Sequence, residues 1–229
     1  MPPDLTWQPS LIDGIDEETP TFDSSYAGIQ RIALDEQSWV DYCPGWLSGS
    51  DALFAELIRS GRWQQRSRWM YTKRVDDPRL TAGWSTDGDD PEIPQVFRDM
   101  AVVLSSRYDV GFDRIWANLY RDGADSVAWH GDKTRLVMTT PLVATVSLGA
   151  RRKFQLRRRG TTKISHTLEP GNGDLVVMGG ECQSNWEHTV PKTKKPVGAR
   201  ISVTIRHSQP GPGERWLQEP KSTEPGHAW

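Results

Sequence analysis

The chain has 229 residues (25.9 kDa), of which 36% are hydrophobic and 25% are charged, with a formal net charge of −2. This length suits one larger domain, and the ordinary charge content excludes a globally disordered chain. No apolar run approaches roughly eighteen residues, which excludes a transmembrane helix, and the first residues lack the pattern of a signal peptide. Cys43 and Cys182 are too few for a disulfide framework or a thiolate zinc site. We expect a monomeric globular protein of the cytoplasm.

Acidic and basic residues are segregated along the chain. Residues 1–58 hold eleven acids and one base, whereas 59–74 hold six bases and 151–163 hold seven bases, with no acid in either. Such local basic runs can follow a phosphate backbone, because counterion release depends on local charge. A solvated face explains them equally well, and for 151–159 an exposed hairpin is the favoured interpretation.

The first half of the chain predicts an arm and two helices. Residues 1–28 are rich in Pro, Asp, Glu, Ser and Thr, which predicts an extended or mobile arm. Ser50 and Asp51 precede an apolar pattern that Gly61 ends, which predicts a short capped helix. A second helix is expected after Pro91, where apolar residues recur at helical spacing.

From Phe112 onward the apolar period changes to two, which is typical of strands. Eight strands are predicted, at 112–120, 126–132, 141–149, 152–158, 164–169, 173–178, 185–190 and 200–207. Many short strands after two helices indicate a mainly β (α+β) fold, a jelly-roll core with the helices packed outside. We expect one domain at 29–208, with its jelly-roll at about 112–208, and a loose tail at 209–229.

Three residues form a candidate metal site. In an extended segment His130 and Asp132 project to the same face, and His188 follows on a later predicted strand. Two histidines and one carboxylate are the facial triad of non-haem Fe(II) oxygenases. The alternative is a pair of hydrogen-bonded histidines near a turn.

A later strand adds polar residues that could bind an acidic ligand. Alternation puts Arg200 and Arg206 on one face, about 20 Å apart at ~3.3 Å per residue, and an apolar stripe on the other. Two long side chains that lean inward could grip both ends of a dicarboxylate. Asn118 and Tyr120 are likewise two residues apart and could donate to the same ligand. Taken singly, an edge-strand charge ladder or a capped turn also explains these pairs.

The chain resembles the AlkB family of Fe(II)/2-oxoglutarate dioxygenases, over about 112–207 and more weakly back to about residue 28. Six short motifs carry the resemblance in family order: N-L-Y (118–120), W-H-G-D (129–132), V-S-L-G (146–149), G-D-L-V-V-M-G-G (173–180), W-E-H-T-V-P-K (186–192) and R-I-S-V-T-I-R (200–206). The order and spacing of the set are far more specific than any single motif. The resemblance implies a double-stranded β-helix core.

The resemblance also assigns roles to the candidate residues. It implies that the two histidines and the aspartate ligate Fe(II). Four side chains would bind 2-oxoglutarate: Asn118, Tyr120, Arg200 and Arg206. By analogy Arg200 takes the distal carboxylate. With O₂, the family converts 2-oxoglutarate to succinate and CO₂ and hydroxylates the alkyl carbon of bases such as 1-methyladenine and 3-methylcytosine, which releases an aldehyde.

For the substrate, the resemblance implies nucleic acid, as single-stranded or flipped-base DNA or as RNA, in a DNA-repair reaction. The segment at about 69–91 resembles the family's nucleotide-recognition lid, in which an aromatic residue stacks on the base. Trp84 is the expected plate, and the ring of His130 would form the opposite one. Stacking contributes about 1–3 kcal/mol per base.

Other aromatic and basic residues of this region are assigned different roles. Trp69 and Tyr71 are the alternative plates, although we expect them to pack in the core. Arg79 and the basic run 59–74 are expected to contact strand phosphates.

One departure from the family puts the base preference in doubt. Several members carry an acidic residue shortly after the metal-binding aspartate, whereas this chain has Lys133, Thr134 and Arg135. An acidic loop of the lid could compensate, through Asp87, Asp89 and Asp90. The iron chemistry could instead act on a small molecule or a protein, and a third reading is a non-enzymatic jelly-roll with a vestigial metal site.

Overall fold

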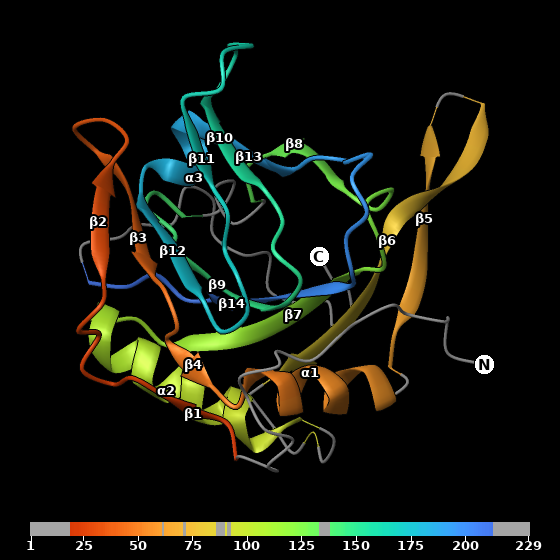
Figure 1. Cartoon of the computed structure of the whole chain (residues 1–229). Coiled ribbons are helices and arrows are strands. Elements are labelled where there is room, and N and C mark those ends of the chain that lie inside the picture. Colours follow the sequence, from red (N-terminus) through yellow and green to blue (C-terminus); the bar gives the residue numbers. More distant parts are fainter. Residues whose placement is uncertain are drawn as a thin grey trace, which may run out of the picture.

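The computed structural model describes residues 19–60, 62–70, 72–85, 90, 93–132 and 138–212. Two sheets face each other and form a double-stranded β-helix, as predicted (Figure 1). The larger sheet has the strand order β2-β3-β12-β9-β14-β7-β6-β5, and the smaller one has the order β11-β10-β13-β8. A third pair, β1 with β4, lies outside both sheets.

The eight strands predicted from Phe112 onward are present, each within two residues of its expected bounds. They are β7 (Phe112–Tyr120), β8 (Val127–His130), β9 (Val143–Gly149), β10 (Phe154–Arg158), β11 (His166–Leu168), β12 (Leu175–Gly180), β13 (Trp186–Val190) and β14 (Arg200–His207). Their alternating sequences predicted them well because each strand has one face in a packed core.

Six strands before residue 90 were not predicted. They are β1 (Thr21–Phe22), β2 (Gln30–Ala33), β3 (Ser38–Cys43), β4 (Leu47–Ser48), β5 (Gln64–Met70) and β6 (Lys73–Ser85). β5 and β6 extend the large sheet beyond β7 as a long antiparallel hairpin. Their charged sequences suit an edge hairpin with much exposed surface, and so lack the apolar alternation of a core strand.

The predicted arm is wrong for its last part, residues 19–28. There Thr21 and Phe22 pair with β4, and the Tyr26 ring is buried and stacks on Trp46 at a centroid distance of 6.1 Å. Packing against the body of the domain therefore fixes this stretch, although its composition is polar. Residues 1–18 lie outside the described part of the chain, as do residues 213–229 of the predicted tail.

Both predicted helices are present, α1 (Ser50–Arg59) and α2 (Gln95–Tyr108), together with a short unpredicted α3 (Cys182–Asn185). The cap of α1 differs from the expectation, because the residue before the helix is Gly49, in the left-handed region with φ of 64°. A glycine adopts that conformation without the steric cost that a Cβ brings.

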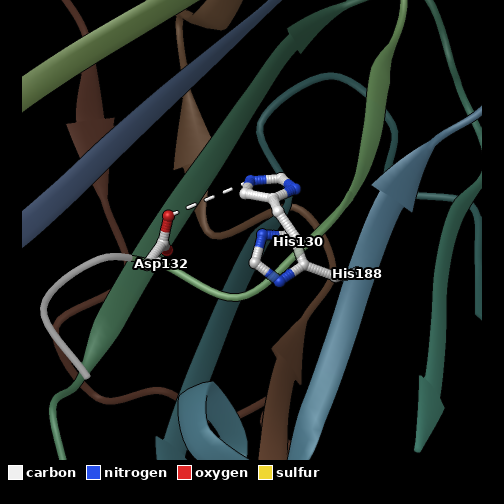
Figure 2. Close-up of side chains that lie close together, drawn as sticks. All are labelled: His130, Asp132 and His188. Carbon is white, nitrogen blue, oxygen red and sulfur yellow. Dashed lines mark ion pairs between the residues drawn. The ribbon is translucent and has the colours of Figure 1, made fainter. Parts of the chain in front are cut away.

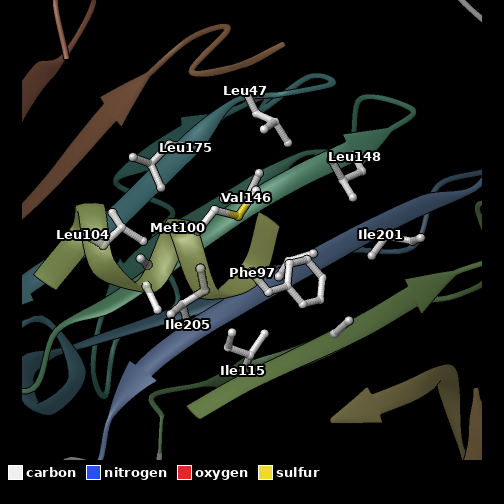
Figure 3. Packing of buried hydrophobic residues seen from close by; sticks show 14 of the residues in the cluster. Leu47, Phe97, Met100, Leu104, Ile115, Val146, Leu148, Leu175, Ile201 and Ile205 are labelled. Carbon is white, nitrogen blue, oxygen red and sulfur yellow. The ribbon is translucent and has the colours of Figure 1, made fainter. Parts of the chain in front are cut away.

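The two faces of the large sheet have different roles. Phe97, Met100 and Leu104 of α2 pack on one face, over apolar residues of the central strands (Figure 3). On β14 this face carries Ile201 and Ile205, and alternation turns Arg200 and Arg206 to the opposite face, between the two sheets. The main core thus lies under the helices, and a second, smaller apolar cluster, with Val176 and Met178 of β12, shares the interior of the β-helix with the polar side chains. Within the described part of the chain, none of the helices combines the length and apolar character that a membrane crossing needs.

Candidate metal and co-substrate site

The three predicted metal ligands converge between the two sheets. His130 ends β8, Asp132 follows two residues later, and His188 lies in the middle of β13 (Figure 2). One potential ligand atom from each residue lies within 4.8 Å of the others. β8 and β13 are paired with His130 opposite His188, so the ladder sets the two rings side by side at 4.3 Å. This spacing and donor set could hold one divalent metal ion.

Hydrogen bonding leaves the ring of His130 ready to ligate. Its Nδ1 lies 2.8 Å from the carbonyl oxygen of Ala128, which accepts a hydrogen bond from Nδ1–H. That bond selects the tautomer in which Nε2 carries a lone pair, and Nε2 lies 4.0 Å from Asp132 Oδ1. The ring is about one-third exposed, so the site opens on its side.

The electrostatics keep the other two ligands in the forms that bind a metal. Burial lowers the pKa of His188 to about 3, an effect that the neighbouring His130 reinforces. The imidazole is therefore neutral at neutral pH. Burial raises the pKa of the Asp132 carboxyl, but Arg206 and the two histidines outweigh this effect and keep the pKa below its usual range. Arg206 Nη2 donates to Asp132 Oδ1 at 2.7 Å.

Arg200 lies further along the inner face and has a guanidinium in need of a partner. Its side chain is 1% exposed, and Nη2 donates to Ser147 Oγ at 2.7 Å. Its Nε and Nη1 have no hydrogen-bond partner among the described residues. Burial lowers the pKa of Arg200 to about 10, which leaves it charged at neutral pH. A buried, under-satisfied cation is a fit for a carboxylate ligand.

The remaining co-substrate candidates lie beside this arginine. Tyr120 is opposite Arg200 in the β7–β14 ladder, and Asn118 is opposite Ser202. The guanidinium carbon of Arg200 lies 5.5 Å from the centre of the Tyr120 ring. Arg206 at one end and Arg200 at the other thus bracket a polar strip on the inner face, with the metal triad at the Arg206 end. This is the arrangement that a dicarboxylate bound next to a metal ion requires.

Comparison with known proteins agrees with this geometry. Residues 40–206 match the 2OG-Fe(II) oxygenase superfamily. The chain is 30% identical over 212 residues to alpha-ketoglutarate-dependent dioxygenase alkB homolog 3 of Bos taurus, covering 84% of this chain and 71% of that protein. It is 32% identical over 136 residues to DNA oxidative demethylase ALKBH2 of Arabidopsis thaliana, covering 48% and 43%. The chain belongs to the AlkB family. It is therefore an Fe(II)- and 2-oxoglutarate-dependent dioxygenase.

Solved structures support the fold of this AlkB-family chain. A prolyl-4-hydroxylase of Pseudomonas putida superposes with a TM-score of 0.51 at 17% identity, and the match covers 74% of this chain and 92% of the hydroxylase. At that identity the likeness bears on the double-stranded β-helix alone.

The predicted role of Trp84 as the base-stacking plate is wrong. Trp84 pairs with Ile115 in the β6–β7 ladder and so lies on the helix-covered face of the sheet, opposite the metal site. Its side chain is 6% exposed, and its ring meets that of Phe97 edge-on at 5.1 Å. On β7, Trp116 shares the site-side face with Asn118. The two-residue spacing of Trp116 and Asn118 along 112–120 is the sequence feature that could have placed Trp116 on this face.

Trp69 also departs from expectation. It was expected to pack in the core, but it lies near the end of the β5–β6 hairpin and is 75% exposed. The alternative plate Tyr71 lies outside the described residues, as do Lys133, Thr134, Arg135, Asp87 and Asp89. Asp90, the remaining member of the acidic loop, forms an ion pair with Arg62 at 3.2 Å.

Arg79 lies beside Asn118 of the co-substrate strip instead of on the surface. Its Nε donates to Asn118 Oδ1 at 3.1 Å, and its side chain is mostly buried. This placement favours a role next to the co-substrate strip over the predicted contact with strand phosphates. Because Arg79 binds the amide oxygen of Asn118, the amide N–H groups of Asn118 point away from Arg79 and are free of this contact.

The basic run 151–159 is largely structural. Arg152 is buried and donates to the carbonyl oxygens of Asp122, Asp125 and Pro191. Arg157 forms an ion pair with Glu187 at 2.8 Å. The segment is therefore part of a hairpin, the interpretation favoured over a phosphate-binding surface. It is less exposed than expected, because several of its arginines bind carbonyl oxygens or carboxylates of the protein.

Proposed function

We propose that this protein dealkylates N-alkylated nucleic-acid bases, of the 1-methyladenine and 3-methylcytosine type, by hydroxylating the alkyl carbon so that an aldehyde is released. The observation that carries the proposal is the His130, Asp132 and His188 triad with the under-satisfied Arg200 at the far end of the same polar strip, in a chain of the AlkB family. Its relatives, an alkB homolog 3 and a DNA oxidative demethylase, support the choice of substrate class.

The side chains divide the work along the inner face. The triad would hold Fe(II), which supplies the oxygen chemistry when it is bound with 2-oxoglutarate and O₂. Arg200, at the buried end, would bind the distal carboxylate, and Tyr120 would lie next to it. Arg206, already tied to Asp132, would hold the end of the co-substrate near the metal. Charge-assisted hydrogen bonds at both ends fix the orientation of a flexible dicarboxylate.

The same arrangement separates the co-substrate from the substrate. Arg200, Tyr120 and His188 are buried, so they exclude water from the co-substrate end. His130 is the exposed member of the triad, so an alkylated base would approach from its side. A base can reach such a site only when it is unpaired or flipped out.

A product assay tests the proposal. With ferrous iron, 2-oxoglutarate and O₂, a single-stranded oligonucleotide carrying 1-methyladenine or 3-methylcytosine is expected to yield formaldehyde and succinate in equal amounts. The unmethylated oligonucleotide and the free methylated nucleoside are the matched controls. Turnover no faster with the methylated oligonucleotide than with the controls would overturn the nucleic-acid assignment and favour a small-molecule or protein substrate.

The β5–β6 hairpin supports a nucleic-acid partner. It projects beside the β-helix (Figure 1) and carries the exposed side chains of Arg68, Trp69, Lys73 and Arg74. An exposed aromatic ring among basic residues suits a single strand, because bases stack on the ring while the cations follow the phosphates. We propose that this hairpin contacts the strand next to the alkylated base.

Trp69→Ala tests that contact. Losing one stacked base is expected to raise the KM for the methylated oligonucleotide by about tenfold, from a stacking energy of about 1–3 kcal/mol. The affinity for 2-oxoglutarate should not change. Val102→Ala removes a similarly exposed apolar side chain from α2 and is the control. Equal KM values for the two variants would contradict the role of the hairpin.

A further inference from the structure

Asp132 is the member of the triad that the sheet does not hold. β8 ends at His130, which is the last residue of this strand paired with β13, so Asp132 lies beyond the end of the ladder. The positions of His130 and His188 follow from strand pairing, whereas that of Asp132 does not. A carboxylate ligand beyond the end of a strand needs another support if it is to stay within reach of two imidazoles.

Gln183, in α3, supplies that support. Its side chain is fully buried, and its Oε1 accepts a hydrogen bond from the backbone N–H of Asp132 at 2.8 Å. This bond fixes the backbone of Asp132, while the bond from Arg206 fixes one carboxylate oxygen. α3 leads directly into β13, so Gln183 ties the segment of Asp132 to the strand that carries His188.

Arg159 holds α3 in place. A single four-residue helical turn has little stability of its own. The guanidinium of Arg159 donates to the carbonyl oxygens of Ser184 at 2.7 Å, Gln183 at 3.1 Å and Trp186 at 3.3 Å. The contact with the metal segment is tight, because a Cβ on Gly131 would collide with this guanidinium and lie 2.5 Å from the Gln183 carbonyl oxygen. Glycine at 131 is what allows this approach.

We infer that Gln183, held by Arg159, is a positioning residue that sets Asp132 for iron binding. The inference rests on the proposed ligand set and adds to it a support from outside the triad, which no sequence motif indicates. Hydrogen-bond partners of metal ligands commonly change metal affinity by about 10–100-fold.

Gln183→Leu is the direct test, because leucine approximates the volume of glutamine and cannot accept the hydrogen bond. With saturating 2-oxoglutarate and without oxygen, Fe(II) is titrated into the full-length protein and followed by the charge-transfer absorption of the iron–2-oxoglutarate complex. The variant is expected to bind Fe(II) about 10–100-fold more weakly than the wild type. Gln183→Glu retains an acceptor oxygen and should recover most of the affinity.

Tyr42→Phe is the control for a general loss of stability. It removes a hydroxyl that donates to Asp174 at 2.6 Å, between β3 and the residue before β12, and it should keep wild-type iron affinity. Thermal unfolding of the metal-free proteins compares the stability of the two variants. Iron affinity of Gln183→Leu equal to that of Tyr42→Phe would overturn the inference.

Arg159→Gln provides a second measurement if Gln183→Leu does not fold. It loosens α3 without altering the acceptor, and it is expected to weaken Fe(II) binding severalfold; unchanged binding would contradict the role of α3. A wild-type protein that fails to bind Fe(II) would instead remove the proposed ligand set, so the two failures are distinguishable.

Discussion

Replacing Arg200 by methionine is expected to weaken the binding of 2-oxoglutarate strongly without destabilising the protein. Truncating one partner of a buried charged hydrogen-bonded pair costs about 2–5 kcal/mol of binding free energy, which corresponds to a roughly 30- to 4,000-fold larger dissociation constant. Arg200 fits this case because it is buried and two of its donors lack partners among the described residues. These donors are the atoms that a distal carboxylate would satisfy.

Most substitutions of buried residues lower the free energy of unfolding, but Arg200→Met is not expected to do so. In the absence of co-substrate, the folded chain carries the cost of a buried guanidinium with a single described hydrogen bond, to Ser147. Methionine removes that cost and keeps most of the apolar volume. The free energy of unfolding of the apo-protein is therefore expected to be unchanged or higher. Wild type should gain stability when 2-oxoglutarate is added, and the variant should not.

Arg152→Met is the matched control, since Arg152 is also buried but donates to three backbone carbonyl oxygens. Its loss leaves these oxygens without a donor and should destabilise the apo-protein by about 2–3 kcal/mol. Denaturant unfolding with and without 2-oxoglutarate measures both effects. An Arg200→Met protein that is as destabilised as Arg152→Met, or that is still stabilised by 2-oxoglutarate, would contradict this assignment.

The catalytic half of the fold could be predicted because the apolar–polar alternation of its strands is a local signal that the sequence shows directly. Strands from Phe112 onward alternate apolar and polar residues, and the same alternation places Arg200 opposite the apolar face of β14. The triad follows from this signal only in part, because strand pairing sets His130 opposite His188, whereas Asp132 lies beyond the end of β8. The predicted strands are therefore confirmed and the three triad residues lie close together, whereas the binding roles of the site residues stay predictions.

The β5–β6 hairpin could not be predicted from the sequence, because its structure depends on partners distant in sequence. β5 and β6 are charged and become strands by pairing onto β7. The side on which Trp84 lies is set by its pairing with Ile115, and a shift of one residue would turn it to the site. No local pattern around Trp84 contains that register.

Support for the metal ligands is also invisible in the sequence. Gln183 follows a buried strand and precedes His188 by five positions, a spacing with no chemical meaning along an extended chain. Only the short turn of α3 brings its amide to the backbone of Asp132. Likewise, the basic run 151–159 has the composition of a phosphate-binding surface, but tertiary partners such as Glu187 engage its arginines.

The revised placement of Trp84 leads to a second large effect. Trp84→Ala is expected to lower the free energy of unfolding by about 3–5 kcal/mol, the range for removing a buried tryptophan from a core. The total stability of a domain is about 5–15 kcal/mol, so this loss is a large share of it. The reason is the cavity that would open between β6 and α2, where the indole now meets Phe97. Trp84→Phe keeps an aromatic ring there and should lose much less.

Substitutions of Trp84 and Trp69 should thus have separate effects, one on the free energy of unfolding and the other on the KM for the oligonucleotide. Trp69→Ala, at an exposed position, is expected to change the free energy of unfolding by about 0.5 kcal/mol or less while it raises the KM for the oligonucleotide. Trp84→Ala should do the reverse when both are assayed at a temperature at which they are folded. Denaturant unfolding and steady-state kinetics on the same preparations measure the two quantities. A Trp84→Ala protein of wild-type stability with a raised KM would return Trp84 to the substrate pocket, because a core position cannot give that combination.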